Sequence, residues 1–467
     1  MAEHGTHAVV LGAGVAGLLA ARVLSESYRT VTVLERDVLA GDLEPRTGVP
    51  QGRHLHNFLA RGTQILGELF PGILDELAAA GATVDDGDDL SRVYVRVADH
   101  EFAPPGRLAD PGPLAAYQAS RPFLEFHVRR RVAALENVTI LDQHDVVEPV
   151  MAGDSVVGVR TVNRRSGVAS VMQAGLVVDA TGRAMRTAHF LESHGFESPP
   201  EERIPSVGGY SSQLLRIPHG VIAERMAFVN EGSRAPGVLL VAYEDDAWML
   251  AVFQPVDGGS PPTSFGEMLV MAEQMLPASL VNGLRGSAPA GQVSIARSTA
   301  ASWRRYDQMP ELPKRLVVLG DALCHLNPMY GQGMSMAALQ ALALRDCLEA
   351  GVVDLPRRFY VGAAQQILPV WTLNRANDGV PARTLKRRLR SRMQQAALRA
   401  ATTDIAVAER VLRVRGLIDP PARLQDPALW WRILLVNLRY AVRGKLPLQK
   451  AFQRGVVRRF PRRLSAR

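Results

Sequence analysis

Short apolar runs and stretches with helical spacing alternate over the first 35 residues of the chain. The apolar run 8–11 has the length of a buried strand and leads into a glycine-rich turn. A helical stretch follows through Val23 and Leu24, and the apolar run 31–34 then ends at Glu35. Continuous apolar runs of this length are typical of strands buried on both faces. The order of strand, turn, helix and strand predicts a βαβ unit at the start of the chain.

The rest of the chain continues this alternation, with one change of period. The hydrophobic spacing predicts helices at about 59–70 and 123–135, and strands at 93–97, 138–141, 156–162 and 175–178. Between about 190 and 300 the period becomes two, which predicts an antiparallel sheet. The run 316–319 returns to the pattern of a buried parallel strand and precedes a helix from about Gln332. From about Asn377 the chain is helical in pattern and rich in arginine.

The length and composition fit a globular protein of more than one domain. The chain has 467 residues, more than one ordinary domain holds, and 47% of them are hydrophobic. Cys324 and Cys347 are too few for a disulfide framework, which favours a reducing, cytoplasmic location. No apolar stretch reaches about 18 residues, and the run 8–11 is too short for a signal peptide. We therefore expect no transmembrane segment and no signal peptide.

The net charge of +8 is concentrated late in the chain, at 386–390 and 458–463. Such basic runs are commonly a solvated helix face or a tail. An acidic partner, such as an acyl carrier protein, or an anionic membrane surface is the alternative. Nucleic acid is not expected as a partner, because neither a recognition motif nor aromatic platforms accompany the charges.

The glycine-rich turn has the spacing of a dinucleotide-binding fingerprint, and it lies inside the predicted βαβ unit. Gly12 permits the tight turn, Gly14 lets the backbone approach a pyrophosphate, and Gly17 lets helix and strand pack closely. The phosphates would lie at a helix N-terminus, where free N–H groups favour an anion. Glu35, followed by Arg36, ends the second strand, where its carboxylate would accept hydrogen bonds from a ribose.

A second signal, some 300 residues later, distinguishes FAD from NAD. Asp321 follows the predicted strand 316–319, and its carboxylate would hold polyol hydroxyls such as those of the ribityl chain, which NAD lacks. The chain then passes through Pro328 to a glycine-rich helix start. The backbone N–H groups of that start would face the pyrimidine edge of an isoalloxazine, where negative charge builds on reduction. This part of the predicted FAD site comprises Pro328, Gly331, Gly333, Met334 and Ser335.

These two signals together resemble the class A flavoprotein monooxygenases, the para-hydroxybenzoate hydroxylase-like family. The family motif GDAAHxxPPxxGxGxN is matched at Gly320, Asp321, Ala322, Pro328 and Gly333, while Cys324 replaces its His and Ser335 replaces its Asn. The resemblance covers about 5–375. It implies that Arg46 reaches toward the flavin and that Arg121 contacts ribityl oxygens.

The family's middle motif is altered in this chain. Asp179 is kept, and the resemblance implies a role for it in FAD and NAD(P)H handling, but Ala180 replaces a Gly and Met185 replaces a Ser. Direct reduction by NAD(P)H is therefore a weaker expectation than FAD binding. NAD(P)H or a partner flavin reductase would supply the electrons.

The resemblance implies an α/β fold with a Rossmann-like FAD-binding domain, an inserted antiparallel-sheet substrate domain and a C-terminal helical appendage. The expected boundaries assign 1–90, 121–189 and 301–376 to the FAD-binding domain, 91–120 and 190–300 to the substrate domain, and 377–467 to the helical region.

A narrower resemblance concerns the segments 46–56, 68–72 and 327–335. They are similar to a secondary-metabolism branch that contains polyether polyene epoxidases and FAD-dependent polyketide cyclases. Halogenases fit less well, because their Trp-x-Trp-x-Ile string is absent.

Four polar residues are candidates for the flavin face or the substrate pocket: Arg53, His54, His56 and Tyr330. The two histidines could orient substrate or bond the loop backbone. A metal pair is disfavoured, because no Cys or carboxylate cluster accompanies them. No residue is assigned as a catalytic acid, base or nucleophile.

The resemblance implies an FAD-dependent monooxygenase, an epoxidase or hydroxylase that passes one oxygen from a C4a-peroxyflavin to an apolar polyketide- or terpenoid-like substrate. A non-redox cyclase of the [4+2] type, with FAD as a structural element, is the alternative. A lipid-binding escort protein on the same fold is less favoured, because both the glycine turn and Asp321 are intact.

Overall fold

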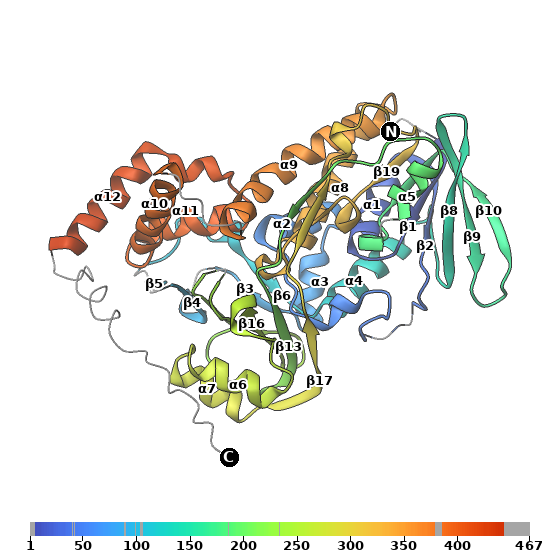
Figure 1. The fold of residues 1–467 in the computed structure, drawn as a ribbon. Helices are drawn as coiled ribbons and strands as arrows, with labels where there is room; N and C mark the ends of the chain where they lie inside the picture. The colour runs from blue at the N-terminus through green and yellow to red at the C-terminus, as the bar shows by residue number, and fades with distance from the viewer. Residues whose placement is uncertain are drawn as a thin grey trace, which may run out of the picture.

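The computed structural model describes residues 5–39, 41, 43–87, 90–98, 100–102, 106–184, 186–232, 234–378 and 385–442. Figure 1 shows two sheets side by side, with helices over and between them and a group of helices at one end. This arrangement confirms the predicted α/β fold with its second sheet and C-terminal helices.

The first sheet is five-stranded and parallel, in the order β19-β11-β1-β2-β7. Its strands are β1 (Gly5–Leu11), β2 (Tyr28–Leu34), β7 (Val138–Leu141), β11 (Leu176–Asp179) and β19 (Leu316–Val318). The apolar runs predicted as strands are fully buried here, as at Val9, Val10 and Val177. Burial on both faces explains why these runs do not alternate with polar residues.

Three helices position the ends of this sheet: α1 (Val15–Leu24), α4 (Arg121–Ala133) and α8 (Gly333–Glu349). Helix α1 contacts both α4 and α8. The residues of α1 that face the sheet, among them Leu18, Leu19 and Val23, have no exposed surface. Helices α2 (Ala60–Leu69), α3 (Ile73–Ala79) and α5 (Arg186–Ser193) complete this part of the fold.

The second sheet is seven-stranded, in the order β17-β13-β16-β15-β14-β4-β5. Its strands are β4 (Val93–Val97), β5 (His100–Glu101), β13 (Gly208–Arg216), β14 (Met226–Asn230), β15 (Gly237–Ala242), β16 (Ala247–Pro255) and β17 (Ala288–Ala296). All neighbours are antiparallel except β4 and β14, which run parallel. The parallel pair was not predicted; β4 comes from a distant part of the chain, so no hairpin turn fixes its direction.

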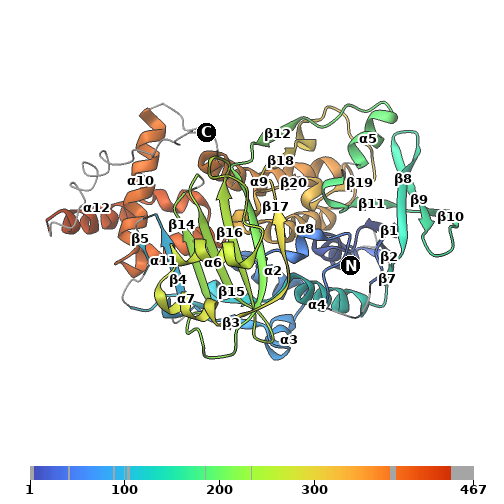
Figure 2. The same ribbon diagram turned by 60° about the horizontal axis from the view of Figure 1, so that its bottom comes forward.

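One face of this second sheet is covered by α6 (Phe265–Glu273) and α7 (Ala278–Arg285), as Figure 2 shows. The helices bury Met268, Leu280 and Leu284 against Leu215 and Leu250 of the sheet. The period-two pattern did not predict these two helices within 190–300. The other face of the sheet turns toward the rest of the molecule.

Within the described residues, the remaining strands form three small, separate sheets. A three-stranded antiparallel sheet consists of β8 (His144–Ala152), β9 (Ser155–Asn163) and β10 (Ala169–Gln173). Further small sheets pair β12 (Glu201–Ile204) with β18 (Ala301–Arg304) and β20 (Cys324–His325), and β3 (Thr83–Asp85) with β6 (Ala116–Gln118).

The described part of the chain after about Asn377 is helical, as predicted, with α10 (Leu385–Ala401), α11 (Ile405–Arg415) and α12 (Pro427–Val442). A long helix that was not predicted, α9 (Leu355–Asp378), precedes them. Helices α10, α11 and α12 share a small core that includes Ala400, Val407 and Ile433. Both views place α11 next to β4. The basic run 458–463 and the side chains of 386–390 lie outside the described residues. No helix in the described ranges has the length and apolar character needed to cross a membrane.

Candidate active site

The glycine turn between β1 and α1 is shaped by lack of space at two of its glycines. Gly12 has φ +97°, and a Cβ there would lie 2.9 Å from the carbonyl oxygen of Ala180. A Cβ on Gly17 would lie 1.9 Å from the carbonyl oxygen of Gly12. At Gly14, the N-cap of α1, a Cβ would meet nothing within 4 Å. The turn is thus tightly packed on the protein side and open in front of the helix N-terminus, the shape that a pyrophosphate requires.

Glu35 at the end of β2 is buried and closely held. Its Oε2 accepts a hydrogen bond from Ala13 N at 2.9 Å, and its Oε1 accepts one from Asp37 N at 3.0 Å. The Nη1 atom of Arg46 lies 2.9 Å from Oε2 as an ion pair. Burial alone would raise the pKa of Glu35, but Arg46 and the two N–H donors hold it below its usual value. The carboxylate is therefore ionised, and it fixes the turn to the second strand.

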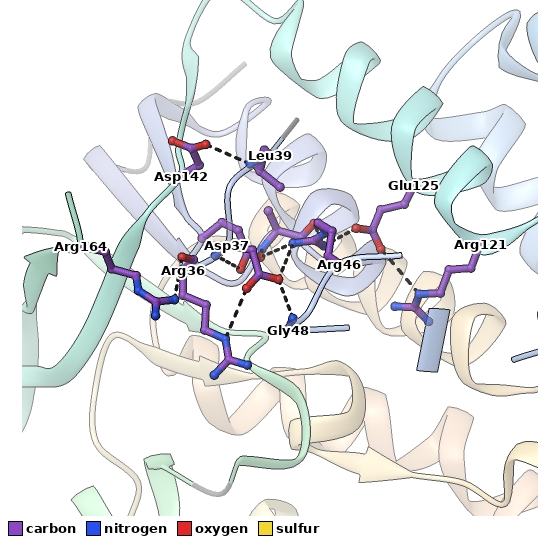
Figure 3. Close-up of polar contacts among 11 residues, drawn as sticks. Arg36, Asp37, Leu39, Arg46, Gly48, Arg121, Glu125, Asp142 and Arg164 are labelled. Atoms are coloured by element: carbon purple, nitrogen blue, oxygen red, sulfur yellow. Dashed lines mark hydrogen bonds and ion pairs between the residues drawn. The ribbon is translucent and has the colours of Figure 1, made fainter. Parts of the chain in front are cut away.

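Arg46 links this carboxylate to helix α4. Figure 3 shows its contact with Glu125 of that helix. Its Nη2 donates to the carbonyl oxygen of Ala13 at 3.2 Å and also to Oε1 of Glu125. Glu125 Oε2 lies 3.6 Å from Nε of Arg121. The i,i+4 spacing of Arg121 and Glu125 was the sequence signal for this pair, and the sequence analysis did not use it.

Two nitrogens of this cluster have no hydrogen-bond partner in the structure. They are Nη1 of Arg46, whose approach to Glu35 lacks hydrogen-bond geometry, and Nε of Arg121. Buried donors of this kind are costly unless a partner is present. Together with the open space at Gly14, they fit an anionic dinucleotide beside the turn. Arg36, in contrast, has a side chain 49% exposed, and its nearest carboxylate oxygen is that of Asp37 at 3.9 Å.

Asp321 lies in a short 3₁₀ turn, Gly320–Ala322, directly after β19. Its side chain is 34% exposed, and its Oδ2 lies 3.3 Å from Nδ1 of His325. The Nε2 atom of His325 is in turn 3.3 Å from Nη1 of Arg183. Burial raises the pKa of Asp321, but His325, Arg121 and Arg183 together bring it below the usual value. Asp321 is thus an ionised carboxylate with open surface, suited to hydroxyl donors.

His325 was missed by the sequence analysis, which looked for the family histidine at Cys324. The i,i+4 spacing of Asp321 and His325 could have indicated the contact. Cys324 itself is buried, as expected for a small packing residue, and burial raises the pKa of its thiol well above the usual value.

The loop after Asp321 presents backbone rather than side chains. Gly331 has φ +62°, and a Cβ there would meet nothing within 4 Å. A Cβ on Gly333, the first residue of α8, would lie 4.0 Å from Oδ1 of Asp321. Met334 is buried, and Ser335 Oγ accepts a hydrogen bond from Leu59 N at 2.8 Å. Of the predicted set, Met334 and Ser335 therefore leave only their main-chain groups for a cofactor.

The carboxylate of Asp179, the acid of the middle motif, accepts hydrogen bonds from residues that closely follow it in the chain. Its Oδ1 accepts from the N–H of Thr181 at 2.8 Å and from its hydroxyl at 2.6 Å, and its Oδ2 accepts from the Thr187 hydroxyl. Asp179 is 3% exposed. Met185 lies outside the described residues.

The two candidate histidines bond within the protein. His54 Nδ1 lies 3.0 Å from Ser212 Oγ, and the ring packs edge-on against Tyr210 with centroids 4.8 Å apart. His56 Nδ1 lies 3.0 Å from the carbonyl oxygen of His54, while its main chain bonds to the hydroxyl of Tyr243. Burial lowers the pKa of His54 to about 4 and that of His56 to about 3, so both rings are neutral at pH 7.

Arg53, which precedes the two histidines, is exposed. No group of three or more potential metal ligands was found in the described ranges.

A large pocket opens on the loop that follows Asp321. Its volume is about 1490 Å³, and its walls are the free face of the seven-stranded sheet, helices α8 and α9, and the C-terminal helices. At one end it is lined by Pro328 and Tyr330. The Tyr330 hydroxyl donates to Asp378 Oδ1 at 2.5 Å, and Asn327 donates to Oδ2 of the same carboxylate at 2.7 Å. Tyr330 thus lines this pocket, with its hydroxyl bound to α9.

Comparisons with known proteins agree with this site. The family described as FAD dependent oxidoreductase matches residues 8–197. Protein Rv3254 of Mycobacterium tuberculosis is 37% identical over 451 residues, which cover 93% of this chain and 94% of that protein. Kynurenine 3-monooxygenase of Salinispora arenicola is 27% identical over 371 residues, with 73% of this chain and 72% of that protein covered.

Solved structures share the fold at low sequence identity. The flavin-dependent brominase Bmp2 superimposes with a TM-score of 0.63 at 16% identity, covering 94% of this chain and 100% of that one. For the p-nitrophenol 4-monooxygenase PnpA of Pseudomonas putida DLL-E4 the TM-score is 0.61 at 17% identity, with 90% and 99% covered. The glycine turn, the family match and the near full-length relative lead to one conclusion: the chain belongs to the FAD-dependent oxidoreductases, and FAD is its cofactor.

Proposed function

We propose that the protein is a monooxygenase that inserts one oxygen atom of O₂ into a large apolar substrate of polyketide or terpenoid type. The observation that carries this proposal is the pocket of about 1490 Å³ that opens on the loop after Asp321. Pockets for drug-sized molecules commonly measure ~300–1,000 Å³. The size and the apolar walls, including Met226, Phe228 and Leu239, support a long or bulky substrate with few polar groups.

The proposed FAD contacts follow the geometry of the turn and the loop. The N-terminus of α1 and Gly14 would hold the pyrophosphate, and Glu35 the ribose of the adenosine. Asp321 would accept hydrogen bonds from the ribityl hydroxyls. We further propose Gly12, Gly17, Arg36, Arg46, Arg121, Asp179, Pro328, Gly331, Gly333, Met334 and Ser335 as members of the cofactor site. When bound, FAD supplies the two-electron chemistry that activates O₂.

The residues of the chain would bind and orient the substrate, and they would exclude water from the site. The apolar sheet face would keep water from the reacting atoms, which suppresses wasteful release of hydrogen peroxide. His54 and His56 are neutral at pH 7, so they would contribute uncharged donors or acceptors at the flavin side of the pocket. Tyr330 would position substrate through its ring, because its hydroxyl is already bonded to Asp378. NAD(P)H or a partner reductase would supply the electrons.

Isotope labelling tests the proposal directly. Chemically reduced holoprotein is mixed with ¹⁸O₂ and a panel of polyene substrates, and the products are analysed by mass spectrometry. A product carrying one labelled oxygen is expected, together with less hydrogen peroxide than the substrate-free protein releases. Release of all oxygen as peroxide with every substrate would contradict an oxygenase.

A non-redox cyclase is the second candidate, and the state of Asp179 favours it. The acid that the family uses in FAD and NAD(P)H handling is here bonded to two threonines of its own segment. A cyclase needs no electron donor. Turnover of a native substrate under strict anaerobiosis, with FAD oxidised throughout and no change of mass, would decide for the cyclase.

A further inference from the structure

One charged side chain in the pocket has no part in the proposed function. Arg415 is the last residue of α11, and it lines the pocket. Its guanidinium carbon lies 5.5 Å from the centroid of the Phe228 ring on β14. Tyr330 is close enough to raise the pKa of the guanidinium, against the effect of burial. A cation at a helix C-terminus is favourable, which explains why α11 tolerates arginine there. It does not explain why the guanidinium lies over an aromatic wall of the pocket.

The neighbouring arginines differ from Arg415 in being paired with carboxylates. The N–O distances are 2.5 to 3.2 Å for Arg410 and Arg413 with Asp419, Arg432 with Asp404, and Arg61 with Glu68. Among the residues that the structure describes, no carboxylate oxygen lies within 4.0 Å of the Arg415 guanidinium. Its one ring contact, with Phe228, does not neutralise the charge.

The guanidinium of Arg415 is accessible to a ligand in the pocket. Arg415 is exposed, and it lines the pocket beside the apolar face of the sheet. The atoms packed around the guanidinium partly desolvate it, which lowers its pKa. A carboxylate that enters the pocket would pair with this free charge, and it would match the planar fork of guanidinium donors.

We propose that Arg415 is the anchor for a carboxylate on the pocket's ligand. The ligand class is a free acid: a long apolar molecule with one carboxylate, bound by Arg415 at that end and by the sheet face along its length. That this ligand is the substrate rests on the proposed function, whereas the anchor is a binding property of the pocket alone. A chain tethered to a carrier protein as a thioester lacks the free carboxylate and would gain nothing from Arg415.

The test compares an acid with its ester. cis-Parinaric acid, a conjugated polyene fatty acid whose fluorescence increases in apolar surroundings, and its methyl ester are titrated into oxidised holoprotein without an electron donor. The wild type is expected to bind the acid at least about tenfold more tightly than the ester, the scale of charge-assisted hydrogen bonds. Arg415→Gln is expected to weaken acid binding about 10- to 100-fold and to leave ester binding within about twofold. Arg415→Lys is expected to keep part of the preference, because it keeps the charge but not the fork.

Arg410→Gln is the matched control, since it removes a guanidinium of the same helix that is already paired with Asp419. It is expected to keep the acid preference. Equal binding of acid and ester by the wild type, or an unchanged preference in Arg415→Gln with normal FAD content, overturns the anchor. Failure of both probes to bind overturns the anchor and the apolar substrate class together. The ¹⁸O₂ experiment tests oxygen transfer separately, so a failed monooxygenase proposal is distinguishable from a failed anchor.

Discussion

The proposed cofactor end and the proposed substrate end of this protein are built in opposite ways. At the cofactor end, the turn from Gly12 to Gly17 leaves almost no free space on the protein side, and buried charges such as Glu35 and Arg46 are paired. At the substrate end, about 1490 Å³ is open, the walls are largely apolar, and Arg415 has no described carboxylate partner. The first end is specialised for one fixed ligand. The second combines a large volume with an arginine, Arg415, that has no described carboxylate partner.

The difference also concerns distance along the chain. The glycine turn and Glu35 lie within one βαβ unit, so their geometry follows from local sequence. The pocket combines β4, β14, α8, α9 and α11, which come from segments spread over residues 93–415 of the chain. We therefore expect two classes of substitution. Those in the turn should abolish FAD binding, and some of them should also destabilise the fold. Those in the pocket should change only the binding of its ligand.

The largest effect is expected at Gly17. A methyl group in Gly17→Ala would lie 1.9 Å from the Gly12 carbonyl oxygen, so strand and helix must move apart. We expect a loss of about 3 kcal/mol or more in the free energy of unfolding of the apoprotein, and no FAD binding. Urea denaturation and the flavin absorbance of the purified protein measure the two effects.

Gly14→Ala is the matched control for that substitution. Its φ of −74° suits alanine, and its Cβ would meet no protein atom within 4 Å. The apoprotein should lose at most about 1 kcal/mol of stability, because an N-cap prefers glycine to alanine, yet it should bind FAD poorly. Normal FAD affinity in Gly14→Ala would contradict a pyrophosphate at this turn.

The next effect is expected at Asp321. Its carboxylate is partly open, and its described ion-pair partner is the side chain of His325. Asp321→Ala should weaken FAD binding by about 10- to 100-fold, because charge-assisted hydrogen bonds contribute ~1.5–3 kcal/mol each. Equilibrium dialysis against FAD measures the change. Asp321→Asn, which keeps an acceptor, should retain an intermediate affinity, and unchanged binding in Asp321→Ala would exclude a ribityl contact.

A smaller, selective effect is expected in the pocket. Leu239 of β15 lines it, and Leu239→Trp would fill part of its volume. FAD content should stay normal while the affinity for an apolar probe such as methyl parinarate falls about tenfold. Val270→Trp adds the same bulk at a position that is 56% exposed on α6 and should change neither property. Normal probe binding by Leu239→Trp would place the ligand elsewhere.

The sequence predicted the cofactor end far better than the substrate end, and the reason is physical. The strands of the parallel sheet are continuous apolar runs, and Gly17 packs against Gly12 of the same turn, although Gly12 itself packs against the distant Ala180. Helices α6 and α7 were not predicted, because the alternation of the strands around them dominated the pattern over 190–300. The parallel pairing of β4 with β14 is a long-range contact that no local period encodes.

The candidate site shows the same division. The spacing predicted Asp321 and the Gly331 loop as cofactor contacts, and Tyr330 lines the large pocket. The partners were not foreseen: Asp378 for Tyr330, and Arg183 for His325. Each joins segments far apart in the chain. Arg415 could not be selected from sequence, because the arginine-rich C-terminal region gives no sign of which guanidinium faces a pocket.

The smallest effect is a pH dependence at the cofactor end. Arg46 and two backbone N–H groups bring the folded-state pKa of Glu35 below its usual value despite burial. A depressed carboxylate pKa stabilises the fold above the unfolded-state pKa, and this contribution is lost as the pH falls through the folded-state value. Wild-type apoprotein should therefore be more stable than Glu35→Gln at pH 7, and the difference should shrink progressively once the pH falls below about 4.5, near the ordinary pKa of a glutamate. Urea denaturation of both proteins across this range measures the difference. A difference in the free energy of unfolding that stays constant with pH would contradict this expectation. It would mean that the shape and hydrogen bonds of Glu35 matter for stability, and that its negative charge does not.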